Sequence, residues 1–304
     1  MIAFIGKRLA QAVITMIAVT IAVFLLSHST GNPADVILPI EAAGEERAAL
    51  IDRLGLNKPL PEQYWIFVSN AAQGNFERSI RTRSPVMELV GDRFWNSIKL
   101  ATAAMGFTIV VSLPLGVIAA VRRGRWADKG AMTFATMGQS LPPFFTGVLS
   151  ILVFAVWLQL LPAQGADSWK HYVLPAVTMG WFTGAGVTRL MRSGMLSVLD
   201  SEYIKLARAK GTSETKVIWK HAMRNALIPV VTFIGLMYGI LLAAAVSTEV
   251  VFGWPGMGRL AFEAVSWRDF PLLQAVVLVW SLVIIGINLL IDLSYGILDP
   301  RIRR

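Results

Sequence analysis

The sequence predicts an all-α, polytopic membrane protein with about six transmembrane helices. Apolar residues make up 55% of the chain and charged residues 15%, whereas soluble domains have about 45–50% and about 25%. A spanning helix needs about 20 largely apolar residues, and six segments have about that length or more. They are Leu9–His28, Ser97–Val121, Ala131–Leu161, Tyr172–Met195, Ile228–Phe252 and Leu272–Gly296.

Basic residues are concentrated in alternate segments between these spans. With the N-terminus inside and six crossings, the inner segments hold 17 basic and five acidic residues, as the positive-inside rule requires. We therefore expect both termini to be cytoplasmic and the net charge of +9 to anchor the inner side. The basic residues are not interleaved with aromatic ones, so we expect no nucleic-acid partner.

Three parts follow along the chain. Residues 1–28 are expected to form the first transmembrane helix, residues 29–96 an extracytoplasmic segment with short helices, and residues 97–304 a five-helix core. The basic pair at positions 7 and 8 resembles the start of a signal peptide, but LSHST after the apolar run offers no small-residue cleavage site. We expect this helix to be retained.

The outer segment 29–96 carries its own helix and turn signals. EERAALIDRLGL, residues 45–56, predicts a short amphipathic helix that Gly55 closes, and PEQYWIFV from Pro61 predicts another. GNFERSIRTRSPVMELV, residues 74–90, supplies turns before the second span. This segment is either a cap that packs on the membrane domain or a docking surface for a binding protein.

Proline and glycine mark the next three spans. Pro114 in the second span and the pair at 142–143 in the third permit kinks, provided that neighbours satisfy the freed carbonyls. Gly180 and Gly184 have the small-xxx-small spacing of closely packed membrane helices. This fourth span is rich in glycine and threonine, so a re-entrant or buried segment is its alternative.

Residues 201–229, here called the basic knuckle, are too polar to cross a membrane. All of them except Pro229 belong to an expected cytoplasmic loop at 196–228. A short helix is expected first, capped by Asp200 or Ser201 through side-chain oxygens that accept from free amides. Leu199, Tyr203 and Leu206 have the three- and four-residue spacing of one apolar face.

The second half of the basic knuckle begins after a glycine. Gly211 is expected to end the first helix, because glycine adopts a left-handed turn without steric cost. Ser213 then starts a second helix that ends at Pro229, since proline fits poorly inside a helix. By shape alone, the basic knuckle is a solvated cytoplasmic loop.

The last two spans carry ionisable or polar residues near their ends. Glu249 lies near the outer boundary, where it is either solvated by headgroups or faces a bundle interior. Asn288 and Asp292 share one face of the sixth span, and contact with a neighbouring helix is the expected role of both.

Several motifs resemble permease subunits of ABC importers. ARAKG (207–211) and HAMRNALIP (221–229) resemble the cytoplasmic coupling loop of such permeases, and more narrowly the first, B-type subunit of the dipeptide, oligopeptide and nickel branch. Lys205 and Leu206 replace the Glu and first Ala of the general permease triplet, which matches that branch. LGLNKPLPEQY (54–64), VFGWPGMG (251–258) and LLIDLSYGILDPRIR (289–303) extend the resemblance over nearly the whole chain.

This resemblance implies a type I ABC-importer permease fold and an ATP-driven, binding-protein-dependent importer, for di- or oligopeptides or similar small solutes, in a bacterial or archaeal plasma membrane. It implies a second homologous permease, two ATPase subunits or domains that hold ATP and Mg, an extracytoplasmic substrate-binding protein and membrane lipid as partners. The implied coupling residues are Lys205, Ala207, Arg208, Lys210, Gly211, Thr212, Ser213, Arg224 and Asn225. The implied pathway residues are Pro142, Phe144, Phe145 and Glu249.

The sequence offers no chemistry of its own for such work. No phosphate-binding loop of the form GxxxxGK[ST] occurs, the three histidines lack metal-ligand spacing, and there is no cysteine. We therefore expect neither an enzyme nor a resident cofactor or metal. The alternative is a self-contained secondary transporter or channel, which often shows internal repeats and intramembrane charges.

Overall fold

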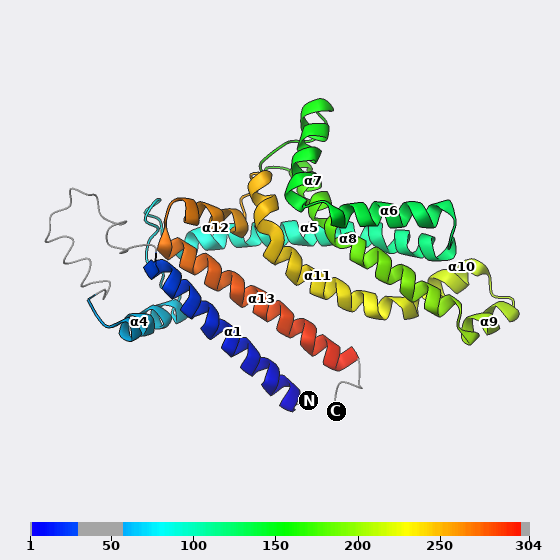
Figure 1. The fold of residues 1–304 in the computed structure, drawn as a ribbon, viewed down its shortest axis with the longest axis horizontal. Coiled ribbons are helices and arrows are strands. Elements are labelled where there is room, and N and C mark those ends of the chain that lie inside the picture. Colours follow the sequence, from blue (N-terminus) through cyan, green and yellow to red (C-terminus); the bar gives the residue numbers. More distant parts are fainter. Residues whose placement is uncertain (1, 30–56, 299–304) are drawn as a thin grey trace. The chain divides into compact units, whose positions relative to one another are not determined.

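The computed structural model describes residues 2–29 and 57–298 (Figure 1). Apart from one isolated bridge between Arg78 and Pro85, the regular structure in these ranges is helical. The helix expected at 45–56 and the chain after Leu298 lie outside the described residues. The chain divides into two units, residues 1–96 with 255–304, and residues 97–254.

The first unit contains the two ends of the chain. Its helices are α1 (Ile2–Ser29), α4 (Leu60–Ala72), the first turns of α5 (Val86–Val121), α12 (Met257–Ser266) and α13 (Phe270–Leu298). α1 runs alongside α13 (Figure 1), and the Gln274 amide donates to the Ser27 hydroxyl at 3.0 Å. α4 contacts α1 through the edge-on rings of Phe24 and Tyr64, 5.5 Å apart.

An apolar core joins the start of α5 to α12 and α13 within this unit. Val86, Leu260 and Leu272 are among its fully or almost fully buried members. Each faces the others because apolar residues recur at helical spacing along these three elements. The core fixes the loop before α5 against the turn between α12 and α13.

The second unit contains the rest of α5 and the elements up to Trp254. These are α6 (Trp126–Ser140), α7 (Pro143–Ser150), the π-helical segment η1 (Ile151–Trp157), α8 (Lys170–Leu199), α9 (Glu202–Ala209), α10 (Glu214–Lys216), the π-helical segment η2 (Val217–Ala222) and α11 (Met223–Val251). α8 lies between α6 and α11 and packs along both (Figure 1).

The glycines of α8 permit the close packing that their spacing predicts. A Cβ atom on Gly180 would lie 2.6 Å from the Ala104 carbonyl oxygen of α5, and one on Gly184 would lie 2.5 Å from the Ser112 hydroxyl. At this approach the Thr108 hydroxyl donates to the Gly180 carbonyl at 2.9 Å. Side chains larger than hydrogen would push α8 away from α5.

Four described helices are long and apolar enough to cross a membrane, and the bent pair of α6 with α7 and η1 adds a fifth. These correspond to five of the six expected spans. The remaining one, Tyr172–Met195, lies in the 30-residue α8, which is not among the apolar helices. The glycine and threonine content of this segment accounts for its lower hydropathy.

The third expected span, Ala131–Leu161, is not one straight helix. α6 ends at Ser140, α7 begins at Pro143, and the axes turn by 105° between them. Pro142 and Pro143 cannot donate backbone hydrogen bonds to the preceding turn, so the chain breaks where a kink was predicted. The size of the bend was not predicted.

Candidate functional site

The first half of the basic knuckle ends as the glycine predicts. Gly211 has φ +79°, and a Cβ atom there would meet nothing within 4 Å, so backbone conformation alone favours glycine. The Thr212 amide donates to the Ala207 carbonyl at 3.2 Å and the Gly211 amide to that of Arg208 at 2.9 Å. This pair of bonds is the Schellman motif, which satisfies the last carbonyls of α9.

The second half begins at Ser213 as expected but does not end where expected. α10, η2 and α11 follow one another without a break from Glu214 to Val251. Pro229 lies inside α11, so the prediction that the helix ends there was wrong. Proline interrupts only one backbone bond, and membrane helices tolerate this when neighbouring groups compensate.

An ion pair bridges the two halves across Gly211. Arg208 donates to both carboxylate oxygens of Glu214, at 2.6 and 3.1 Å. These bonds raise the pKa of the Arg208 guanidinium above its ordinary value, so it stays charged. The side chains are 42% and 56% exposed, so the pair contributes little stability, and the geometry of the turn is set mainly by Gly211 and its two backbone bonds.

A single residue anchors α9 to the rest of the second unit. Ile204 is fully buried in a core with Met195, Val217 and Ala222. The Asn225 amide donates to the Tyr203 hydroxyl at 2.6 Å, which adds a polar tie from α9 to α11. α9 is thus held to the end of α8 and the start of α11.

Two finer predictions about α9 need correction. Ser201 occupies the N-cap position but makes no capping bond, because its hydroxyl donates to the Val198 carbonyl instead. Tyr203 and Leu206 do not face the core: they are 41% and 56% exposed. The inward side chain is Ile204, one position away from the expected face.

A second ion pair joins α6 to α8, the helix that leads into the basic knuckle. Arg192 on α8 donates from Nε and a terminal nitrogen to the two Asp128 oxygens, at 2.6 and 2.7 Å. The Gly124 amide also donates to Asp128, at 2.9 Å. The side chain of Asp128 is only 6% exposed, so this bidentate pair ties α6 to the last turns of α8. The sequence alone does not indicate this pair, because the partners lie 64 positions apart.

The structure brings the predicted coupling residues together on one basic surface element. Ala207 and Thr212 are half-buried. The others are exposed: Lys205, Arg208, Lys210, Gly211, Ser213, Arg224 and Asn225. Lys205 pairs with Glu202 at 2.8 Å, and Asn225 joins α11 to α9 through Tyr203.

The predicted pathway residues do not share one accessible surface. Pro142 precedes α7, and Phe144 and Phe145 are 52% and 44% exposed. Glu249 is fully buried and accepts a bond from the Ser97 hydroxyl at 2.5 Å. Its solvation by headgroups is therefore wrong, and it faces the interior of the second unit.

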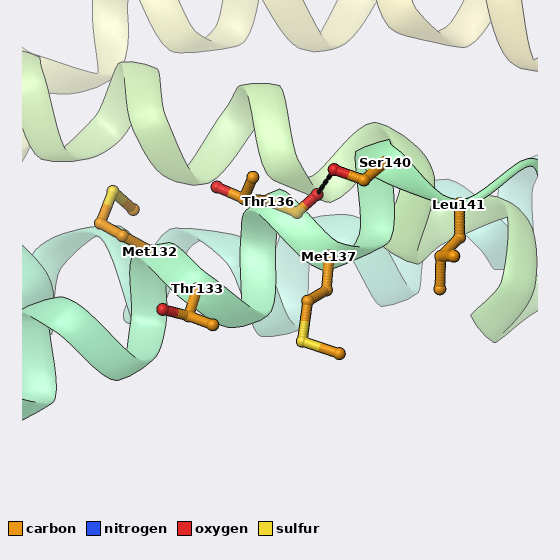
Figure 2. Close-up of a pocket in the computed structure, with 6 residues that line it drawn as sticks. All are labelled: Met132, Thr133, Thr136, Met137, Ser140 and Leu141. Atoms are coloured by element: carbon orange, nitrogen blue, oxygen red, sulfur yellow. Dashed lines mark hydrogen bonds between the residues drawn. The ribbon is translucent and has the colours of Figure 1, made fainter.

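An open hollow of about 420 Å³ lies along α6. Figure 2 shows its lining, in which the Ser140 hydroxyl bonds to the Thr136 carbonyl. The lining residues are Met132, Thr133, Thr136, Met137, Ser140 and Leu141. None of the predicted site residues belongs to it. Among the described residues, no group of three or more His, Cys, Asp or Glu is placed to hold a metal ion.

Comparisons with known proteins agree over the full length of the chain. Residues 112–304 match the family model described as binding-protein-dependent transport system inner membrane component, and residues 1–101 match the model of its N-terminal part. The glutathione transport system permease protein GsiC of Escherichia coli K12 is 43% identical over 304 residues, which cover 100% of this chain and 99% of GsiC. GsiC of Shigella flexneri serotype 5b is 42% identical with the same coverage.

Solved structures share the fold at lower sequence identity. A chain of the inward-facing MetNI methionine ABC transporter superposes with a TM-score of 0.60 at 17% identity, over 71% of this chain and 98% of that one. A chain of an amino acid ABC transporter with histidines superposes with a TM-score of 0.53 at 14% identity, over 68% and 93%.

Proposed function

The chain belongs to the family of binding-protein-dependent transport system inner membrane components, and from this membership we propose how its parts divide the work of an importer. It is a multi-pass permease subunit of an ABC importer in the plasma membrane. The expected fold, all-helical and of the importer-permease type, is confirmed by the solved structures.

The basic knuckle is the part that a cytoplasmic ATPase pushes. One observation supports this assignment. α9 is anchored by the buried side chain of Ile204, whereas Tyr203, Leu206 and the basic residues around Gly211 are exposed. An element held firmly on one side and open on the other suits transmission of force. The coupling surface comprises Lys205, Ala207, Arg208, Lys210, Gly211, Thr212, Ser213, Arg224 and Asn225.

Movement of the knuckle reaches the membrane helices through its anchors. Ile204 packs where α8 ends, and Tyr203 bonds to Asn225 on α11, so a push on α9 moves both helices together. ATP binding can drive this movement only if the ATP-bound ATPases bind one conformation of the permease more tightly than the other. Access then alternates as α8 and α11 tilt. Pro142, Phe144 and Phe145 are proposed to line the path, and Glu249, which is buried in this structure, would have to become accessible as the helices tilt.

The remaining parts of the importer are other chains. Two ATPase subunits or domains carry ATP and Mg and perform the hydrolysis, a second homologous permease completes the pathway, and a binding protein delivers substrate. The termini and residues 196–228 face the cytoplasm, and residues 29–96 lie outside. This assignment rests on the excess of basic residues in the inner segments.

The substrate class is a small peptide or peptide-like solute, with a glutathione-like tripeptide as the first candidate. Full-length identity of 43% to a glutathione transport permease supports this choice.

The function is tested by purifying the chain with its partner permease and ATPase subunits and measuring uptake in proteoliposomes. We expect uptake to require ATP and the binding protein, and Gly211→Asp to abolish coupled uptake. Gly74→Asp is a matched control, because Gly74 is also exposed at positive φ (+72°) but lies in the first unit, outside the coupling surface. Nucleotide-independent uptake by this chain alone, unchanged in Gly211→Asp, would identify the secondary transporter of the alternative.

A further inference from the structure

Within the first unit, a buried carboxylate holds the loop before α5 against the turn before α13. Asp269 is fully buried, and its Oδ2 accepts from the Ser79 hydroxyl at 2.5 Å and from the Arg81 amide at 3.2 Å. Its Oδ1 accepts from the Leu272 amide at 3.3 Å. One side chain therefore joins two segments that lie 188 positions apart in sequence.

The two joined segments present arginines on their outer side. Arg81 and Arg83 in the loop and Arg268 in the turn are exposed, and we call these three the arginine surface. Among the described ion pairs, none involves these three side chains. Every basic residue of segments 74–90 and 255–270 is an arginine.

The backbone under this surface is strained and well fixed. Arg83 has φ +61° and Arg268 has φ +53°, a left-handed conformation that arginine rarely adopts. The Ser84 carbonyl accepts from the Ser79 amide at 2.9 Å, and the Arg83 carbonyl accepts from the Arg78 guanidinium at 3.1 Å. Strain that the surroundings hold in place is a feature of binding and switch sites.

The proposed membrane topology places the arginine surface outside the cytoplasm. Arg81 and Arg83 belong to residues 29–96, and Arg268 belongs to the segment between the fifth and sixth spans. Both segments are extracytoplasmic when the N-terminus is inside and six spans alternate, the arrangement that the excess of basic residues in the inner segments favours.

We propose that the arginine surface docks a carboxylate-rich patch of the extracytoplasmic binding protein, a proposal that rests on the proposed function. Planar guanidinium groups bind carboxylates in pairs of parallel hydrogen bonds. A fixed array suits a folded partner, because groups ordered in advance lose less entropy on binding. Fluid lipid headgroups adapt to any arrangement and are attracted by lysine as well as by arginine, so a membrane surface accounts for neither the strain nor the absence of lysine.

The test measures ATPase activity of the complete importer in nanodiscs against the concentration of its purified binding protein. In Arg81→Glu/Arg83→Glu/Arg268→Glu, we expect the half-saturating concentration to rise at least tenfold, with the maximal rate at saturation unchanged. A higher salt concentration is expected to raise the half-saturating concentration of the wild type, because salt screens the charges. The gap between the wild type and the triple Glu variant should therefore become smaller. Lys170→Gln, which removes another exposed basic charge, is expected to match wild type.

A second variant separates docking from folding. Arg83→Gly removes the side chain and relieves the positive φ, so we expect a complex at least as heat-stable as wild type with a half-saturating concentration raised several-fold. Arg→Lys at all three positions is expected to fall between wild type and the triple Glu variant, because the charge remains but paired hydrogen bonding is lost.

Two results overturn the proposal while leaving the proposed function intact. One is a wild-type importer that the binding protein stimulates with the same half-saturation in every variant. The other is a half-saturating concentration that the triple variant raises only in discs containing phosphatidylglycerol and not in phosphatidylcholine discs. That result would identify the arginine surface as a lipid-binding surface. A wild-type complex that the binding protein never stimulates contradicts the proposed function itself.

Discussion

Removing Arg192 while leaving Asp128 in place tests most directly the ion pair that ties α6 to α8. The Asp128 side chain is 6% exposed and that of Arg192 is 27% exposed, so the carboxylate depends more on its partner than the guanidinium does. Arg192→Met keeps the aliphatic stem but leaves a buried, uncompensated charge. Breaking one partner of a buried pair costs about 3–5 kcal/mol.

Asp128→Asn and the double variant show how much of this destabilisation comes from each partner. Asp128→Asn keeps an acceptor for the Gly124 amide and leaves Arg192 able to reach water, so we expect the loss of a charged hydrogen bond, about 1.5–3 kcal/mol. The double variant removes both charges, and its cost is expected to be well below the sum of the two. The double-mutant cycle of these variants should therefore give an interaction free energy between Asp128 and Arg192 of at least about 1.5 kcal/mol, within the range for residues in contact.

The assay is thermal unfolding of the purified importer in detergent. Association of the subunits is measured alongside it. At roughly 2–4 °C per kcal/mol, Arg192→Met is expected to lower the midpoint by about 10 °C, and the double variant by much less. Arg189→Met is the control, because its side chain is exposed and bonds to the Gln139 side chain rather than to a carboxylate. Strict additivity of the two single variants would refute a buried, mutually dependent pair.

Three further outcomes are expected from single positions. Gly211→Ala should weaken ATPase association several-fold, because the left-handed conformation costs alanine about 1–2 kcal/mol, and Gly211→Asn should weaken it less. Titration with the ATPase subunit measures both affinities, and equal affinities of the two variants would contradict the reasoning. Gly138→Ala places a Cβ atom 2.5 Å from the Trp181 ring, so we expect a lower thermal midpoint, whereas the exposed Gly130 should accept alanine without loss. Ser97→Ala removes a donor to buried Glu249, at about 1.5–3 kcal/mol, and an unchanged midpoint would count against that bond.

Local signals in the sequence predicted local structure well. Gly211 ends α9, Ser213 precedes α10, and Gly180 with Gly184 sits at a close approach of two helices. Each depends on one residue and its immediate backbone, which propensity and spacing describe. Pro229 does not end its helix, because proline removes only one backbone hydrogen bond while Ala226 and Val230 on either side pack in the core of the second unit.

Long-range partners could not be predicted in the same way. Asp128 with Arg192, and Asp269 with Ser79, are paired only after folding brings distant segments together. The buried side of α9 was displaced by one position because a helix of eight residues offers too few apolar positions to define its face. The coupling and pathway roles of the named residues stay predictions until they are measured.

The division of α9 between one buried residue and an open remainder has an evolutionary consequence. Ile204 alone is buried in that helix, and Tyr203 adds a hydrogen bond with Asn225 of α11. If α9 receives the ATPase, as proposed, substitutions at its other positions would alter the match to that ATPase without loosening the joint to the membrane helices. Related importers in one cell could then diverge in which ATPase each one binds. Exchanging the outer side chains between two such permeases, with the isoleucine and the tyrosine retained, is the corresponding route to exchanging their ATPases by design.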